Sequence, residues 1–382
     1  MAPAGAALGR GHTLAQCPPL RPPTGRPRDG RRLGEHRQRA SMWRPARDPA
    51  PVHGGSPSSP EPRARYGATV IGLGLLVAAG VLLGAGSELF AEHAGAAARR
   101  FGLTTLAVGL LLAGAEPEEL VTGIVASARH LPGVAAGDAI GSNVTMLTVV
   151  LGLILVARPG TLRRPAVPYA LAAAGAGAAA AVALLGGELT RPAGAGLVAA
   201  YLLAVLAIWR RERRPPAIGE VAELEEEEDD GEERTRAGSL APLAVAAGLV
   251  AMAAGGFLAV SGADRLVHSL GLSESVVGST LVALATTAEL FALVWAAFRR
   301  DLGELALAGL LGSVLYNATA TLGVATLVHP LATSGLDGAA WLAAGLPLVL
   351  LGLRRLPDMA VRGAGMLLVL AYGVYLGLSF AR

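Results

Sequence analysis

Long apolar segments alternate with short charged ones from Tyr66 to the C-terminus. Most are close to the roughly 20 residues that an α-helix needs to cross a hydrocarbon core of about 30 Å. We therefore expect an all-α membrane protein. The pattern predicts ten spanning helices, at residues 67–92, 102–128, 134–157, 167–186, 192–210, 241–267, 272–298, 303–328, 335–353 and 358–380.

Two segments lack this pattern. Residues 1–65 are rich in Pro, Gly, Ser and Arg and predict a disordered tail, unless translation starts at Met42 and most of it is never made. No apolar stretch follows its basic residues before the first span, so it does not read as a signal peptide. Residues 213–239 contain the acidic run 225–230, which is typical of a solvated loop or, less often, of a weak cation sensor. This loop separates two halves of five helices, 66–212 and 240–382.

Composition agrees with a helical bundle in lipid. The 382 residues are 53% hydrophobic and only 16% charged, with a mean hydropathy of +0.51, whereas soluble domains carry about 25% charged residues. The 51 glycines suit membrane helices, because small residues let neighbouring backbones approach closely. One cysteine, Cys17, allows no disulfide within the chain.

Arginines in the short loops predict the orientation. The loops on the other side carry little beyond Arg129, Arg191 and Arg265. Positive loops stay in the cytoplasm, so we expect a multi-pass protein of the cell membrane with a cytoplasmic acidic loop and both termini outside, although the arginine-rich tail argues the other way. The arginine-rich loops carry Arg99-Arg100, Arg158 with Arg163-Arg164, Arg210-Arg211 with Arg213-Arg214, Arg299-Arg300 and Arg354-Arg355.

The two halves resemble each other in sequence. Gly114-Ala-Glu-Pro-Glu-Glu-Leu120 and Gly137-Asp-Ala-Ile-Gly-Ser-Asn143 recur in the same order as Ala285-Thr-Thr-Ala-Glu-Leu290 and Leu311-Gly-Ser-Val-Leu-Tyr-Asn317. An odd number of helices in each half makes the second copy insert upside down. Inverted-topology repeats are typical of secondary transporters, which bind substrate near the bilayer midplane. A channel or a scaffold could share this topology.

Glu119 and Glu289 lie inside predicted spans, where an ionised side chain costs several kcal/mol and indicates function. Glu116 and Thr286 precede them by one helical turn and would share their faces. The plainer alternatives are a hydrogen bond to a neighbouring helix or a position at headgroup level. The histidines lie at span ends, where solvation is the commoner role.

Further oxygen donors accompany these glutamates. Pro117 removes a backbone donor and frees a carbonyl, which lipid tolerates only beside protein or a wet cavity. Hard cations such as Ca²⁺ take six to eight oxygens at about 2.3–2.6 Å, so the sequence predicts a cation site. The other candidate ligands are small polar residues in apolar surroundings: Asp138, Ser142, Asn143, Ser313 and Asn317.

From about residue 67 to the C-terminus, the four repeated segments resemble the paired alpha repeats of the sodium/calcium exchanger family. The family pattern is Gly-Thr-Ser-x-Pro-Glu-Leu followed by Gly-Asn-x-x-Gly-Ser-Asn-x-x-Asn. The resemblance implies that Glu119 and Glu289 are the paired cation-binding carboxylates, and that the first and sixth spans, holding Glu88 and Asp264, slide against the core. It also places Ser142 and Ser313 on the family's serines, Asn317 on its final amide or acid, and Glu116 and Thr286 on its other serine.

The chain departs from that pattern at several ligand positions. Ala115 and Ala285 replace threonines, Met146 replaces an asparagine and Gly309 another, so several neutral oxygens that the family uses for sodium are missing. Carboxylates crowded in a low dielectric favour holding protons, which suits a proton-coupled site better than a sodium-coupled one. The coupling ion therefore stays open between Na⁺ and H⁺.

The function that we predict is a secondary-active antiporter exchanging a divalent cation, best matched by Ca²⁺, for Na⁺ or H⁺ by alternating access. The lost ligands also allow a non-transporting membrane scaffold or sensor, and a third alternative is an antiporter for K⁺ or Mn²⁺. We expect no enzyme, because no nucleotide-binding motif or Ser-His-Asp set is present. The expected partners are the transported cations and the lipid bilayer, with no nucleic acid and no resident cofactor.

Overall fold

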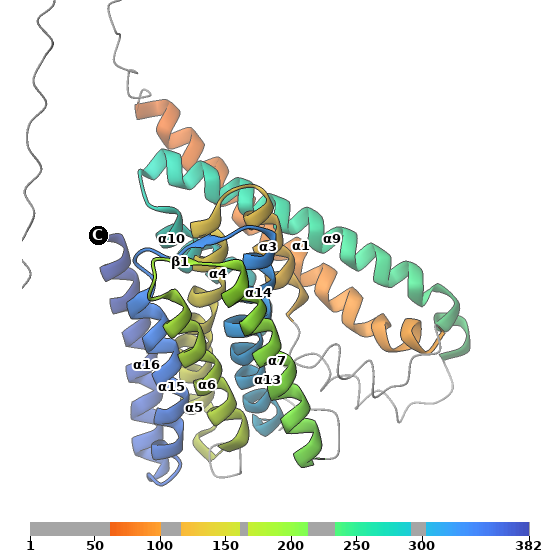
Figure 1. Cartoon of the computed structure of the whole chain (residues 1–382), viewed down its shortest axis with the longest axis vertical. Helices are drawn as coiled ribbons and strands as arrows, with labels where there is room; N and C mark the ends of the chain where they lie inside the picture. The colour runs from red at the N-terminus through yellow and green to blue at the C-terminus, as the bar shows by residue number, and fades with distance from the viewer. Residues whose placement is uncertain (1–61, 101–115, 161–166, 213–233, 292–302, 382) are drawn as a thin grey trace, which may run out of the picture. The chain divides into compact units, whose positions relative to one another are not determined.

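The computed structural model describes residues 62–100, 116–160, 167–212, 234–291 and 303–381, all within one unit that spans residues 60–382 (Figure 1). Most of the predicted tail, most of the acidic loop and the first part of the second predicted span lie outside these residues.

The described chain is almost entirely helical, with one pair of two-residue strands. Its elements are α1 (Pro62–Arg100), α3 (Pro117–Ala128), α4 (Pro132–Thr145), η1 (Met146–Val150), α5 (Leu151–Ala157), α6 (Val167–Leu184), β1 (Glu188–Leu189), α7 (Arg191–Glu212), α9 (Arg234–Leu270), α10 (Glu274–Val277), η4 (Gly278–Val282), α11 (Ala283–Thr286), α13 (Gly303–Tyr316), η5 (Asn317–Thr321), α14 (Leu322–Val328), β2 (Leu331–Ala332), α15 (Asp337–Leu353) and α16 (Asp358–Phe380).

Seven helical segments among the described residues are long and apolar enough to cross a membrane. Shorter apolar helices, Glu274–Thr286 and Asp337–Leu353, fall within the seventh and ninth predicted spans. The prediction of a helical membrane protein is therefore confirmed. The seven segments are α1, α4 to α5, α6, α7, α9, α13 to α14, and α16.

Helices α1 and α9 are longer than predicted and lie side by side (Figure 1). They contain 39 and 37 residues, and α9 begins at Arg234, inside the segment predicted as a loop. At 1.5 Å per residue each is more than about 55 Å long, well beyond a hydrocarbon core, so both must tilt or extend past it. Hydropathy misses the extra turns because they are polar.

Glycines let α1 and α9 touch backbone to backbone at two points. A Cβ on Gly86 would lie 2.9 Å from the Gly248 carbonyl oxygen, and one on Gly262 would lie 2.9 Å from that of Gly72. No side chain fits at either crossing, which is the close helix packing that membrane proteins build from small residues. The early glycine of each helix meets the late glycine of the other.

The central helical segments, α4 to α5 and α13 to α14, pack against the outer helices α16 and α7 in the same way. A Cβ on Gly152 of α5 would lie 2.8 Å from the Gly365 carbonyl oxygen of α16. One on Gly323 of α14 would lie 2.7 Å from the Gly194 carbonyl oxygen of α7. Each central segment is therefore held against an outer helix that lies far from it in sequence.

Both central segments contain a π-helical turn. η1 begins at Met146 and η5 at Asn317, each four residues after a Gly-Ser pair. Such turns hold one extra residue within the helix and often lie at functional sites. The hydropathy pattern carries no signal of them, and the sequence analysis did not predict them.

A short antiparallel ladder adds strand to the predicted all-α fold. Glu188 pairs with Ala332 and Leu189 with Leu331. The Thr333 amide extends the contact by donating to the Gly187 carbonyl at 3.1 Å. The ladder thereby joins the connection between α6 and α7 to the connection between α14 and α15.

Candidate cation site

The first turn of α3 holds three glutamates. Pro117 is the first helical residue, and Glu116 is the non-helical residue before it. Proline suits this position because its missing N–H would be unpaired there anyway. Glu118 and Glu119 follow within the same turn, where the positive end of the helix dipole favours negative charge. Glu116 and Glu119 therefore flank a helix start instead of sharing one continuous helical face.

The site is deeply buried. Glu119 is 0% exposed and Asp138 of α4 is 1% exposed, while Glu116 and Glu118 are each 4% exposed. Among the described residues, no arginine or histidine forms an ion pair with Glu116, Glu119 or Asp138. Burying a charge costs several kcal/mol unless something compensates it. The buried carboxylates of Glu116, Glu119 and Asp138 therefore require a cation, protons or both.

Hydrogen bonds join these acids to the second half of the chain. Asn317 Nδ2 donates to Glu116 Oε2 at 3.2 Å, and its own Oδ1 accepts from Thr321 Oγ1 at 3.0 Å. Thr286 Oγ1 donates to Asp138 Oδ1 at 3.1 Å and lies 3.4 Å from Ser142 Oγ. Donors of the second half thus meet acids of the first half.

Other oxygens of the site have no such bond. Both oxygens of Glu119 are buried, and no donor in the described chain meets them with hydrogen-bond geometry, although the Ser142 hydroxyl lies beside the carboxylate. Glu119 also interacts electrostatically with Glu116, Asp138 and Glu118. Buried polar atoms in native proteins are normally paired, so these oxygens indicate room for a ligand. The others in the described chain include Glu116 Oε1, Asp138 Oδ2, Asn143 Oδ1 and Ser313 Oγ.

Glu289 comes from the matching turn of the second half. The α-helix α11 ends at Thr286 and the chain turns at Thr287, so Thr286 and Glu289 do not sit on one unbroken α-helical face as predicted. Glu289 is partly exposed and faces α1, where a Cβ on Gly84 would lie 3.4 Å from its Oε2. The hydrogen bonds described above do not include it.

The structure brings most of the predicted ligands together. Asn143 is at the edge, because its Nδ2 donates to the Val314 carbonyl at 3.2 Å while its Oδ1 has no partner among the described residues. The sequence analysis missed Glu118, whose Oε2 accepts from Ser87 Oγ of α1 at 3.0 Å. A signal existed, because a proline at a helix start places all three nearby glutamates in one turn. The ligands that gather are Glu116, Glu119, Asp138, Ser142, Thr286, Ser313 and Asn317.

Buried carboxylates on interrupted helices in a membrane protein define a cation transporter. The chain belongs to the sodium/calcium exchanger protein family, whose family model matches residues 71–210 and 240–381. This is a family of transporters, so the expectation that the chain is not an enzyme is confirmed, as is the resemblance noted in the repeats.

Two relatives with similar sequences agree with this family assignment. A putative antiporter, CaxA of Alkalimonas amylolytica, is 26% identical over 287 residues, covering 72% of this chain and 87% of that protein. The inner membrane protein YrbG of Escherichia coli is 28% identical over 298 residues, covering 74% of this chain and 88% of that protein.

The fold is that of a solved exchanger. The sodium-calcium exchanger NCX_Mj, in a structure soaked with Na⁺ and Sr²⁺, matches with a TM-score of 0.52 at 23% identity, covering 81% of this chain and 98% of that one.

Proposed function

We propose that this protein is a secondary-active antiporter that exchanges a divalent cation, best matched by Ca²⁺, for Na⁺ or H⁺ across the cell membrane. One observation carries the proposal. Glu119 is completely buried, lacks a hydrogen-bond donor among the described residues and interacts with three other buried carboxylates. Such a group is stable only when a cation or a proton offsets its charge.

The donor set favours a hard divalent ion. The site consists of carboxylate, hydroxyl and amide groups, and these are the oxygen ligands that Ca²⁺ takes. Each divalent ion offsets two carboxylate charges at once, which suits a site with four acids better than a single monovalent ion does. None of its gathered ligands is a cysteine or a histidine, the ligands that softer metals prefer.

The architecture that we propose is ten spanning helices arranged as two inverted five-helix repeats, with halves at 66–212 and 240–382. The glycine contacts support it. Gly152 and Gly323 are 171 residues apart, as are their partners Gly194 and Gly365, and each glycine of one half packs on one of the other half. The π-turns at Met146 and Asn317 keep the same spacing. An inverted repeat produces this kind of reciprocal contact.

Transport would proceed by alternating access, with α1 and α9 moving against the core that holds the carboxylates. The glycine-to-glycine crossings hold the backbones of α1 and α9 in close contact, so the two helices would move as one unit. We propose that the arginine-rich loops and the 213–239 segment face the cytoplasm and that both termini lie outside.

Flux from proteoliposomes loaded with Ca²⁺ tests the proposal. An imposed Na⁺ gradient, and in a separate arm a pH gradient, should drive Ca²⁺ movement, and the arm that responds identifies the coupling ion. Glu119→Gln should abolish flux. Glu188→Gln, at an exposed glutamate of β1, is the matched control and should keep it.

No Ca²⁺ flux under either gradient, from protein that elutes as a folded species, would reject Ca²⁺ antiport. Mn²⁺ or K⁺ flux under the same gradients would then identify another cation as the substrate. No flux of any of these cations would favour the non-transporting scaffold as the function.

A further inference from the structure

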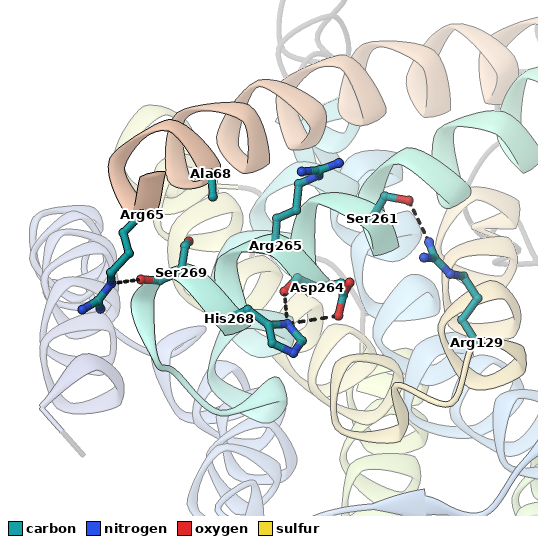
Figure 2. A pocket seen from close by; sticks show the side chains of 8 residues that line it. All are labelled: Arg65, Ala68, Arg129, Ser261, Asp264, Arg265, His268 and Ser269. Carbon is teal, nitrogen blue, oxygen red and sulfur yellow. Dashed lines mark hydrogen bonds and ion pairs between the residues drawn. The ribbon is translucent and has the colours of Figure 1, made fainter. Parts of the chain in front are cut away.

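A cavity of about 460 Å³ lies away from the carboxylate site, between α1, α9 and the end of α3 (Figure 2). Three arginines line it: Arg65 from the first turns of α1, Arg129 after the last residue of α3, and Arg265 near the end of α9. Asp264 is the one acidic residue among the described lining residues and lies beside His268, with 3.3 Å between Oδ1 and Nδ1. The cavity is therefore strongly basic, which makes it unfavourable for cations and favourable for anions.

These arginines stand out because the loops on this side of the protein carry few positive charges. Arg191, the other exception noted in the sequence, is explained by its bonds to the Leu327 and Val328 carbonyls at the end of α14, at 3.2 and 3.1 Å. Arg129 and Arg265 instead line one cavity together with Arg65. Their positions within three separate elements argue for a shared ligand.

The guanidinium groups keep donors for that ligand. Arg65 Nε donates to the Ser269 carbonyl at 3.1 Å, and Arg129 Nη1 donates to Ser261 Oγ at 2.7 Å (Figure 2). The Arg129 guanidinium also lies over the Phe257 ring, 4.8 Å from its centroid, so both heads are oriented. Arg265 is exposed and makes no hydrogen bond or ion pair with any described residue. A planar guanidinium with free N–H groups matches the oxygens of a phosphate.

The location indicates that the phosphate belongs to a lipid. α1 begins three residues before Arg65, α3 ends one residue before Arg129, and α9 ends at Leu270, so the cavity lies at the ends of three helices, near the membrane surface. Tyr66, 75% exposed, lies in the same turn of α1 as Arg65, and exposed aromatic residues are typical of this level of the bilayer. Apolar side chains exposed by about half, Val70 and Ile71, follow along α1 and offer a surface to acyl chains.

The length of the cavity also favours a lipid headgroup over a free phosphate ion. Ser261 and Ser269, which orient the two outer arginines, are eight residues apart on α9, or about 12 Å. A free phosphate cannot extend over that distance, whereas a glycerophosphate headgroup with its ester groups occupies much of it.

We propose that this cavity binds the phosphate headgroup of an anionic phospholipid, held by Arg65, Arg129 and Arg265. A bound headgroup contacts α1, α9 and α3 together. It therefore links the α1–α9 pair to the helix that carries Glu116, Glu118 and Glu119, without taking part in the cation site itself.

Lipid retention by the purified full-length chain tests the proposal without any transport assay. Native mass spectrometry would compare phosphatidylglycerol with phosphatidylcholine, which has the same glycerophosphate but no net charge. We expect the wild type to retain phosphatidylglycerol preferentially. The Arg129→Gln/Arg265→Gln double variant should lower that retention about tenfold or more, because each arginine near a membrane surface adds affinity for anionic headgroups. Arg265→Lys should retain an intermediate amount.

Arg354→Gln, at an exposed arginine between α15 and α16, is the matched control and should behave as the wild type. Equal retention of the two lipids would overturn the proposal, and so would an unchanged preference in the double variant. Displacement of phosphatidylglycerol by inorganic phosphate at equal concentration would overturn the lipid as the ligand. Should the double variant elute as misfolded protein, the comparison of Arg265→Lys with Arg354→Gln still decides the outcome.

Discussion

The turn that holds Glu119 and the turn that holds Glu289 occupy matching positions in the two halves but have diverged in chemistry. Glu116, Glu118 and Glu119 in the first correspond to Thr286, Ala288 and Glu289 in the second, each 170 residues later. The first turn is buried and carries three acids, whereas Glu289 is partly exposed and faces α1.

The difference shows how the halves divide the work of one site. The first half supplies charge, including Asp138 of α4, and the second half supplies the donors Thr286 and Asn317 that bond to those charges. Glu116 and Asp138 thus accept hydrogen bonds from the other half, whereas Glu118 accepts one from Ser87 of its own half. The packing glycines Gly152 and Gly323, in contrast, make the same kind of contact in both halves, so the two halves differ less in these contacts than in their acidic residues.

The largest expected effect is on transport. Glu119→Gln should lower Ca²⁺ flux at least about 100-fold. Even residues that only support a metal ligand contribute about 10–100-fold in metal affinity, and neither oxygen of Glu119 has a hydrogen-bond partner among the described residues. Glu289→Gln should also lose flux, since the resemblance pairs the two residues. Initial rates in proteoliposomes measure both. Wild-type flux in Glu289→Gln would show that the second turn has left the site altogether.

Substitution of a packing glycine should lower stability by a similar amount in the two halves, whereas substitution of the ligands should not have equal effects. Gly152→Val and Gly323→Val each force a side chain against a facing backbone, and overpacking typically costs about 1–3 kcal/mol. Thermal unfolding in detergent should show similar losses for both. Gly175→Val, at a glycine of α6 with nothing within 4 Å of its added Cβ, is the control and should be almost neutral. A large loss in only one half would contradict a symmetric scaffold.

Cation binding should stabilise the folded protein through the acidic turn. A ligand present at 100 times its dissociation constant stabilises the native state by about 2.7 kcal/mol. Ca²⁺ should therefore raise the unfolding temperature of the wild type but not that of Glu119→Gln, and Mg²⁺ serves as the control cation. An equal rise in both proteins would place the bound ion elsewhere.

The smallest effect concerns the donors of the second half. Thr286→Val leaves Asp138 Oδ1 without its donor, and an unsatisfied buried group costs about 1–3 kcal/mol, or roughly tenfold in apparent cation affinity. Thr326→Val is the matched control, because Thr326 Oγ1 bonds only to the Leu322 carbonyl of its own helix, at 2.7 Å. Equal affinities in the two variants would mean that the bond across the halves is not needed for binding.

Much of the fold and of the candidate site could be predicted from the sequence. Spans such as 167–186 and 358–380 follow from hydropathy because lipid leaves a spanning chain few alternatives to helix. Glu116 and Asp138 were predicted as ligands because acids in apolar segments demand an explanation. Asn317 and Thr286 are also predicted as ligands, but the sequence does not predict their bonds to Glu116 and Asp138, since these join residues more than 140 positions apart and depend on tertiary packing.

Local chemistry explains the other misses. Glu118 is not among the predicted ligands, although the helix start at Pro117 gathers it with Glu116 and Glu119 in one turn. The full lengths of α1 and α9 were missed because their end turns are polar.

The π-turns η1 and η5 change the direction in which the residues after them point from the helix. Each residue advances an α-helix by about 100°, so one additional residue rotates everything beyond it by that angle relative to everything before it. Ser142 and Ser313 lie before the π-turns, and Gly152 and Gly323 lie after them. The direction in which each segment presents its ligands is thus set independently of the direction in which it presents its packing glycine. Substitutions before the π-turns could therefore alter the candidate cation site without turning the glycines after them away from their neighbours.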